Sequence, residues 1–219
     1  MFVYAFIFLG LWGVLATDEN CSDQRLHGCF PDRGDVASFP GTEEELRQLC
    51  SYLRNGVRCL ENVKEDCGLE SHDQERMEIV GDFTRAICQE GSRLYTNIVE
   101  NLACLKERIE NDFGLCRTMT INNLMSLHEH LEDRRSPKSP DRLHQFYSCL
   151  YVSLEGNCFL VQAFKKCGVD AKDTALEVLD RAGIYIEQCP TSLRLEIEEM
   201  LEILALGNRD DIFVKDLLV

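Results

Sequence analysis

Apolar residues recur every three or four positions along most of the chain, which is the spacing of one face of an α-helix. The first stripe begins after Thr42 and stops before Gly68. Thr42 and Glu45 match a capping box, in which two side chains bind free backbone N–H groups of the first turn. Gly68 suits the left-handed conformation that often ends a helix. The pattern therefore predicts a long helix between Thr42 and Gly68.

Further helical stripes follow, and residues that start or stop helices bound most of them. A second capping box, at Ser71, predicts a helix that ends before Gly91, and Asp170 is expected to cap a later one. We expect the remaining helices at about 93–114, 121–131, 140–168 and 192–206. No run alternates apolar and polar residues as a strand would. The predicted fold class is all-α.

The cysteines show that part of this helical pattern occurs twice. One set is separated by 9, 8 and 21 positions and a later set by 9, 9 and 22, and a Cys-Gly pair stands at the bend of each ("CGLESHDQ", "CGVDAKDT"). The first set is Cys50, Cys59, Cys67 and Cys88, and the second is Cys149, Cys158, Cys167 and Cys189. We therefore predict a disulfide-stapled helical bundle that is built from two repeated helical hairpins.

Hairpin geometry selects one disulfide in each copy. Cys50 and Cys88 stand equally far from the first bend, so two antiparallel helices bring them face to face. Cys149 and Cys189 are placed in the same way about the second bend. Each pair should staple the open end of its hairpin, with a stabilisation of about 2–4 kcal/mol.

The other cysteines are less constrained. Cys59 and Cys67 lie about 12 Å apart along one helix, too far for a disulfide, so they and Cys158 and Cys167 must reach other elements. Cys104 and Cys116 either supply some of these partners or pair with each other around a bend. The polar run "CSDQRLHGC" favours a small loop closed between Cys21 and Cys29.

The chain begins with a segment that is typical of a secretory signal. Its first sixteen residues carry no charge and end in small residues, so we expect cleavage after Ala16 and a secreted, extracellular protein. All twelve cysteines follow that point, and an oxidising compartment favours six disulfides. The expected organisation is a signal peptide (1–16), an N-terminal segment with a local disulfide (17–41), a first helical half (42–133), a proline-containing basic loop (134–140), a second hairpin (141–190) and a C-terminal helix and tail (191–219).

A family resemblance follows from the cysteine spacings between helices. The runs "LCSYLRNGVRCLENVKEDC" and "ICQEGSRLYTNIVENLACLKERIENDFGLC", with the second cysteine set, resemble the arthropod hemolymph glycoproteins named for a twenty-seven-kilodalton member. The likeness covers Cys50 to Cys189 and includes no catalytic signature. It implies a secreted helical protein that is often glycosylated, although the only sequon here, at Asn20, has a cysteine in its middle position.

Charge and motifs narrow the chemistry. The chain has 23 basic and 38 acidic residues, a net charge of −15, which disfavours nucleic acid and anionic membrane surfaces as partners. In "HEH", His128 and His130 point to different sides of a helix and cannot share a metal ion. Protease, hydrolase and phosphate-loop motifs are absent from the sequence. We expect no enzyme activity, no cofactor and no metal site.

Two functions fit these expectations. The first is an extracellular binding or carrier protein whose helical hairpins enclose a small hydrophobic ligand. Phe83, Phe146, Phe159 and Phe164 either line such a cavity or fill the core, which is the commoner place for such residues. The second is a secreted effector, such as a venom component or inhibitor, that acts on another protein. The C-terminal helix and the apolar tail "DIFVKDLLV" either pack on the core of their own chain and complete the bundle, or the tail is an exposed segment that docks a second copy or another secreted protein.

Overall fold

The computed structural model describes residues 28–30, 39–67, 71–132, 140–183, 188–194 and 196–197. These residues are predominantly helical and include no strand, so the predicted all-α class is confirmed. The expected signal peptide, Cys21, Asn20, most of the loop at 134–140 and the tail after Ile197 lie outside the described residues.

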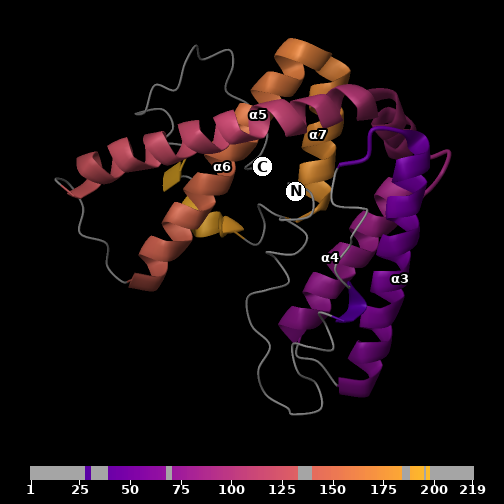
Figure 1. Cartoon of the computed structure of the whole chain (residues 1–219). Coiled ribbons are helices and arrows are strands. Elements are labelled where there is room, and N and C mark those ends of the chain that lie inside the picture. Colours follow the sequence, from indigo (N-terminus) through magenta and orange to yellow (C-terminus); the bar gives the residue numbers. More distant parts are fainter. Residues whose placement is uncertain are drawn as a thin grey trace. The chain divides into compact units, whose positions relative to one another are not determined.

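The chain divides into two compact units, residues 1–106 and 107–219. In the first unit, α3 (Glu43–Cys67) and α4 (Ser71–Cys88) run side by side, as Figure 1 shows. In the second unit, α6 (Pro140–Cys167) and α7 (Val169–Arg181) also lie against each other. The division falls inside α5 (Arg93–Glu132).

The start of α3 shows why the sequence begins a helix there. Glu45 N donates to Thr42 Oγ1 at 3.2 Å, and Glu45 Oε2 accepts from Gly41 N at 2.6 Å. The capping box is thus confirmed, with the carboxylate reaching one residue further back than expected. The apolar stripe of α3 is buried against α4, where Leu53 and Phe83 are each 2 % exposed. Burial of this stripe, more than local propensity, stabilises the hairpin.

One long helix replaces two predicted ones. We expected a helix to stop near Gly114 and a weaker one to follow, but α5 runs through Gly114 without interruption. Ser92 opens it, because Tyr95 N donates to Ser92 Oγ at 3.1 Å. A glycine inside a helix costs only about 1 kcal/mol, which a helix of 40 residues can absorb. Gly114 therefore lowers the stability of α5 slightly but does not end the helix.

The bend between α6 and α7 is a single glycine. Gly168 has φ +91°, a left-handed conformation that other residues rarely adopt, and it occupies the N-cap position of α7. The expectation that Asp170 caps α7 is wrong, because no side chain caps this helix and Asp170 lies in its first turn. α7 ends at Arg181.

The hairpin staples occur where the register of the helices places them. Cys50 pairs with Cys88, with Cα atoms 5.4 Å apart, and Cys149 pairs with Cys189, with Cα atoms 4.7 Å apart. Residues 188–197 follow α7 and are anchored to α6 by the second of these staples. Leu193 and Ile197 are buried there. The first part of the segment expected as a C-terminal helix is therefore core.

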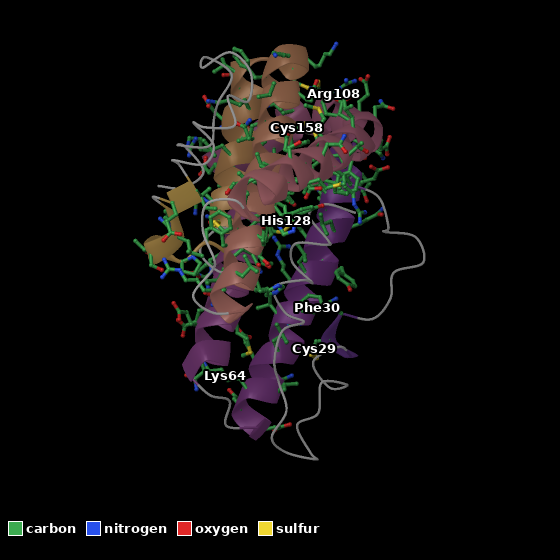
Figure 2. The ribbon with its side chains drawn as sticks, turned by 90° about the vertical axis from the view of Figure 1, so that its left-hand side faces the viewer. Cys29, Phe30, Lys64, Arg108, His128 and Cys158 are labelled. Atoms are coloured by element: carbon green, nitrogen blue, oxygen red, sulfur yellow. A yellow bond between two sulfur atoms is a disulfide. The ribbon has the colours of Figure 1, made fainter. Side chains whose placement is uncertain are left out.

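The predicted pairing of Cys21 with Cys29 is wrong. Cys29 pairs with Cys59 of α3, with Cα atoms 5.3 Å apart. The next residue, Phe30, lies over Gly56 so closely that a Cβ placed on Gly56 would be 2.0 Å from Phe30 Cε1. Burial of Phe30, which is 6 % exposed, brings its neighbour Cys29 to α3. Figure 2 shows Cys29 and Phe30 together beside this hairpin.

Candidate binding surface

The second half of α5 presents an uncharged face to solvent. Arg117 is the only charged residue at 113–128, a stretch of sixteen positions in a strongly acidic chain. The four large apolar side chains that are exposed here are Leu115 (52 %), Met119 (46 %), Ile121 (42 %) and Met125 (61 %). We call the surface formed by these four side chains the α5 face. All of it belongs to the second unit.

Helix geometry arranges the α5 face in rows. Leu115 and Met119 are one turn apart, and so are Ile121 and Met125, so each pair lines up along the helix. Thr118 and Asn122 form an exposed row between the two pairs and carry no charge. The arrangement is a band of apolar and small polar groups about three turns long, with no carboxylate to repel an apolar molecule.

The opposite side of α5 is held in the core. Cys116 and Thr120 are each 1 % exposed and Leu127 is 2 % exposed. A disulfide joins Cys116 to Cys158 of α6, with Cα atoms 5.5 Å apart. His128 Nδ1 and Tyr147 Oη lie 2.8 Å apart and add a second link between the two helices. The α5 face is thus mounted on a helix fixed at two points.

Of the alternatives for Cys116, the structure selects a partner on another helix and not Cys104. Cys104 and Cys167 are also each disulfide-bonded. The side chain of Cys67 lies outside the described residues. Among the described cysteines none is a free thiol, so none is available as a nucleophile.

A buried carboxylate lies one turn from this disulfide on α6. Glu155 is only 3 % exposed, and Tyr151 donates its hydroxyl to Glu155 Oε1 at 2.9 Å. Burial raises the pKa of Glu155 above its usual value, although the Tyr151 hydrogen bond and the charge of Arg117 oppose this. Burial and the neighbouring carboxylate raise the pKa of Tyr151 to about 12. The hydrogen bond joins two successive turns of α6, with the Glu155 side chain buried and Tyr151 half-buried.

Charged groups in the first unit form ion pairs and hydrogen bonds with the start of α3. Arg47 pairs with Glu43 and Glu90, and Tyr95 donates its hydroxyl to Glu43 at 3.1 Å. The hydrogen bond from Gly41 N, then the one from Lys106, lowers the pKa of Glu45. These contacts bind the start of α3 to its neighbours, and they explain the charges without a ligand.

The four phenylalanines expected to line a cavity have different environments. Phe83 is 2 % exposed in the first unit, whereas the other three belong to the second. Phe146 and Phe159 are half-buried, and Phe164 is 41 % exposed. Phe83 is an ordinary core residue of the α3–α4 hairpin.

The described residues also bear on metal binding and membrane insertion. Within the described ranges, no three His, Cys, Asp or Glu side chains are grouped as a metal site would require. Among those same residues, no helix is both long enough and apolar enough to cross a bilayer. The side chain of His130 lies outside the described residues, and His128 contacts Tyr147.

Comparison of the chain with protein families, with characterised proteins and with solved structures finds no match. The α5 face is therefore argued from this chain alone. Sequence reasoning missed it, because the expected helix boundary at Gly114 divided it from the preceding helix. The signal that was available is the scarcity of charge at 113–128.

Proposed function

We propose that the protein is a secreted extracellular binding or carrier protein without catalytic activity, similar in kind to the hemolymph glycoproteins that its cysteine spacings resemble. Its two hairpins are copies of one disulfide-stapled unit. The disulfides, the charge-free start of the chain and the acidic composition support an extracellular setting.

The single observation that carries this proposal is the α5 face. Folded proteins rarely leave neighbouring large apolar side chains exposed, and contiguous patches of this kind often mark interaction sites. Two of its four members are methionines, whose flexible and polarizable side chains adapt to ligands of different shape. The Cys116–Cys158 disulfide keeps the helix in place, so binding does not require α5 to be ordered first.

The exposed position of the face also favours a second candidate. A helix side that is open to solvent contacts a partner from one direction only, which suits the surface of another protein as well as a small hydrophobic ligand. An effector that docks on a foreign protein, such as a venom component or inhibitor, would use it in the same way. The net charge of −15 on this chain favours a protein partner whose contact surface is basic or neutral.

The proposal is tested with an apolar probe and matched variants. The mature wild-type protein and the double variant Met119→Glu/Met125→Glu are each titrated with the neutral dye Nile red. The control is Val169→Glu, because Val169 is 53 % exposed in the same unit but lies on α7. We expect saturable binding that the double variant weakens by about tenfold or more and that the control retains.

Equal binding by all three proteins would refute an apolar site on α5, and so would the absence of binding both to the mature protein and to a chain that lacks residues 211–219. Native mass spectrometry of protein purified from its source then separates the two candidates. A co-purified lipid or other hydrophobe supports the carrier, and a stoichiometric protein partner supports the effector.

A further inference from the structure

We infer that residues 211–219, "DIFVKDLLV", dock on the α5 face of their own chain and cover it. The inference concerns what occupies the face before any external ligand arrives, so it goes beyond the proposed function and stands independently of it. The segment itself lies outside the described residues, and its docking is argued from the described residues at both ends of the path.

The chemistry of the segment matches that of the face. Six of its nine residues are apolar, and they are Ile212, Phe213, Val214, Leu217, Leu218 and Val219. A peptide this short is unstable alone in water, so its apolar side chains require a surface to bury against. The α5 face supplies exposed apolar side chains at a spacing that a short helix or extended segment can contact.

The chain reaches the face easily. Described residues end at Ile197, which is fully buried, and the preceding Glu196 pairs with Arg142 in the first turn of α6. Arg142 is five residues from Tyr147, whose hydroxyl lies 2.8 Å from His128 of α5. The last described residues are therefore tied to the first turn of α6, and Tyr147 of the same helix contacts α5 one turn further along. From Ile197 the thirteen residues 198–210 can span about 40 Å, which exceeds the length of the α5 face.

Length and charge agree with this placement. The positions from Leu115 to Met125 extend for about 15 Å along α5, and nine residues in a helix extend for about 14 Å. The segment carries two aspartates and one lysine, whereas the only charge at 113–128 is the positive Arg117. Docking within one chain also benefits from an effective concentration of about a millimolar, which a second copy does not have in dilute solution.

Methionine oxidation gives a direct readout. Hydrogen peroxide oxidises methionines according to their exposure, and peptide mass spectrometry reports each site separately. Met119 and Met125 lie on the α5 face, and Met77 on α4 of the first unit is an internal control. We compare the mature full-length chain with a chain lacking 211–219 and with the length-preserving variant Phe213→Asp/Leu217→Asp.

Docking within the chain predicts that both changes raise the oxidation rate of Met119 and Met125 by about fivefold or more and leave Met77 unchanged. Protection in the full-length chain must also persist when the protein is diluted tenfold. Unchanged rates in both altered chains would overturn the inference. So would a loss of protection on dilution, which would assign the cover to a second copy, or an equal rise at Met77, which would show general loosening of the fold.

This readout separates the inference from the proposed function. Nile red could bind through Met119 and Met125 while their oxidation rates stay the same with and without residues 211–219. That result supports the binding site and refutes the docking of the segment on it. If the segment protects both methionines but no apolar probe binds after its removal, the face is only a docking place for the chain itself.

Discussion

The helices α3 and α6 carry the same framework with opposite chemistry. Each has a tyrosine two residues after its first cysteine and a second cysteine nine residues after it, Tyr52 and Cys59 in α3, Tyr151 and Cys158 in α6. The position between them is Gly56 in α3, whereas in α6 it is the buried Glu155. One staple pattern therefore accommodates two different contacts.

The partner cysteines continue the comparison. Cys59 binds Cys29, and the following Phe30 packs over Gly56 and against Tyr52, with ring centroids 5.8 Å apart. Cys158 binds Cys116, and the following Arg117 acts electrostatically on Glu155 and Tyr151. In the first unit the space over Gly56 is filled by an apolar ring. At the equivalent position of the second unit stands the carboxylate of Glu155, whose charged form is disfavoured by burial. The difference teaches that disulfide spacing constrains which helices meet but not the chemistry of their contact.

Removal of the hairpin staples should have the largest effect. The double variants Cys50→Ala/Cys88→Ala and Cys149→Ala/Cys189→Ala each open a crosslink, of sequence separation 38 and 40. We expect each to lose about 2–4 kcal/mol of unfolding free energy, because the closed loops are nearly equal. Urea unfolding followed by circular dichroism measures both. Losses that differ by more than about 1.5 kcal/mol would break the equivalence of the two hairpins.

Gly56→Ala tests the apolar contact in the first unit. A Cβ at Gly56 would lie 2.0 Å from Phe30 Cε1, so the ring must move away. Overpacking of this kind costs about 1–3 kcal/mol, more than the helix propensity that alanine gains. Thermal unfolding should show a lower Tm for this variant.

Gly114→Ala is the matched control, because it is also inside a helix but a Cβ there meets nothing within 4 Å. It should gain about 0.5–1 kcal/mol from the better helix former. In a background that carries Phe30→Ala, Gly56→Ala should also raise the free energy of unfolding, because the ring that its Cβ would overlap is gone. If Gly56→Ala is stabilising while Phe30 is present, the ring does not occupy the position above it.

Glu155→Gln should have a smaller effect, and its sign depends on pH. The pKa of this acid is raised in the folded protein, so the folded state binds more protons than the unfolded state between the ordinary value of 4.5 and the raised one. The wild type therefore loses stability as the pH rises through that window. Glutamine carries no charge and can still accept from Tyr151. We expect its Tm to exceed that of the wild type at pH 7 by about 1–3 °C, and the gain to vanish below pH 4.

Glu45→Gln gives the contrasting response from the first unit. The pKa of Glu45 is lowered by hydrogen bonds from Gly41 and Lys106, so its contribution is present above the ordinary value and is lost as the pH falls through the lowered one. The substitution should therefore lower Tm at pH 7 and change it little at low pH. Parallel pH profiles for the two variants would refute the contrast between the units.

Local patterns in the sequence were sufficient for much of the fold. The Thr42 cap, the bend at Gly168 and the burial of Leu53 follow from interactions within a few residues or from one helical stripe. The staples were also predictable, because equal distances from a bend place Cys50 opposite Cys88. In these cases the residues that contact one another are separated only by a turn or by regular helix, so their spacing in the sequence predicts the contact.

Contacts between distant elements could not be read in this way. The short spacing of Cys21 and Cys29 favoured a local loop, but Cys29 is bonded to Cys59 of α3 and the next residue, Phe30, is buried over Gly56. The α5 face was missed for a related reason, since Gly114 looked like an end until the helix was seen to continue. The all-α class, the Thr42 cap and the two hairpin staples were thus determined by the sequence alone, because backbone geometry carries their information over short distances. Only the tertiary structure decided which apolar residues became core and which remained exposed, because burial depends on the elements that happen to pack on each face.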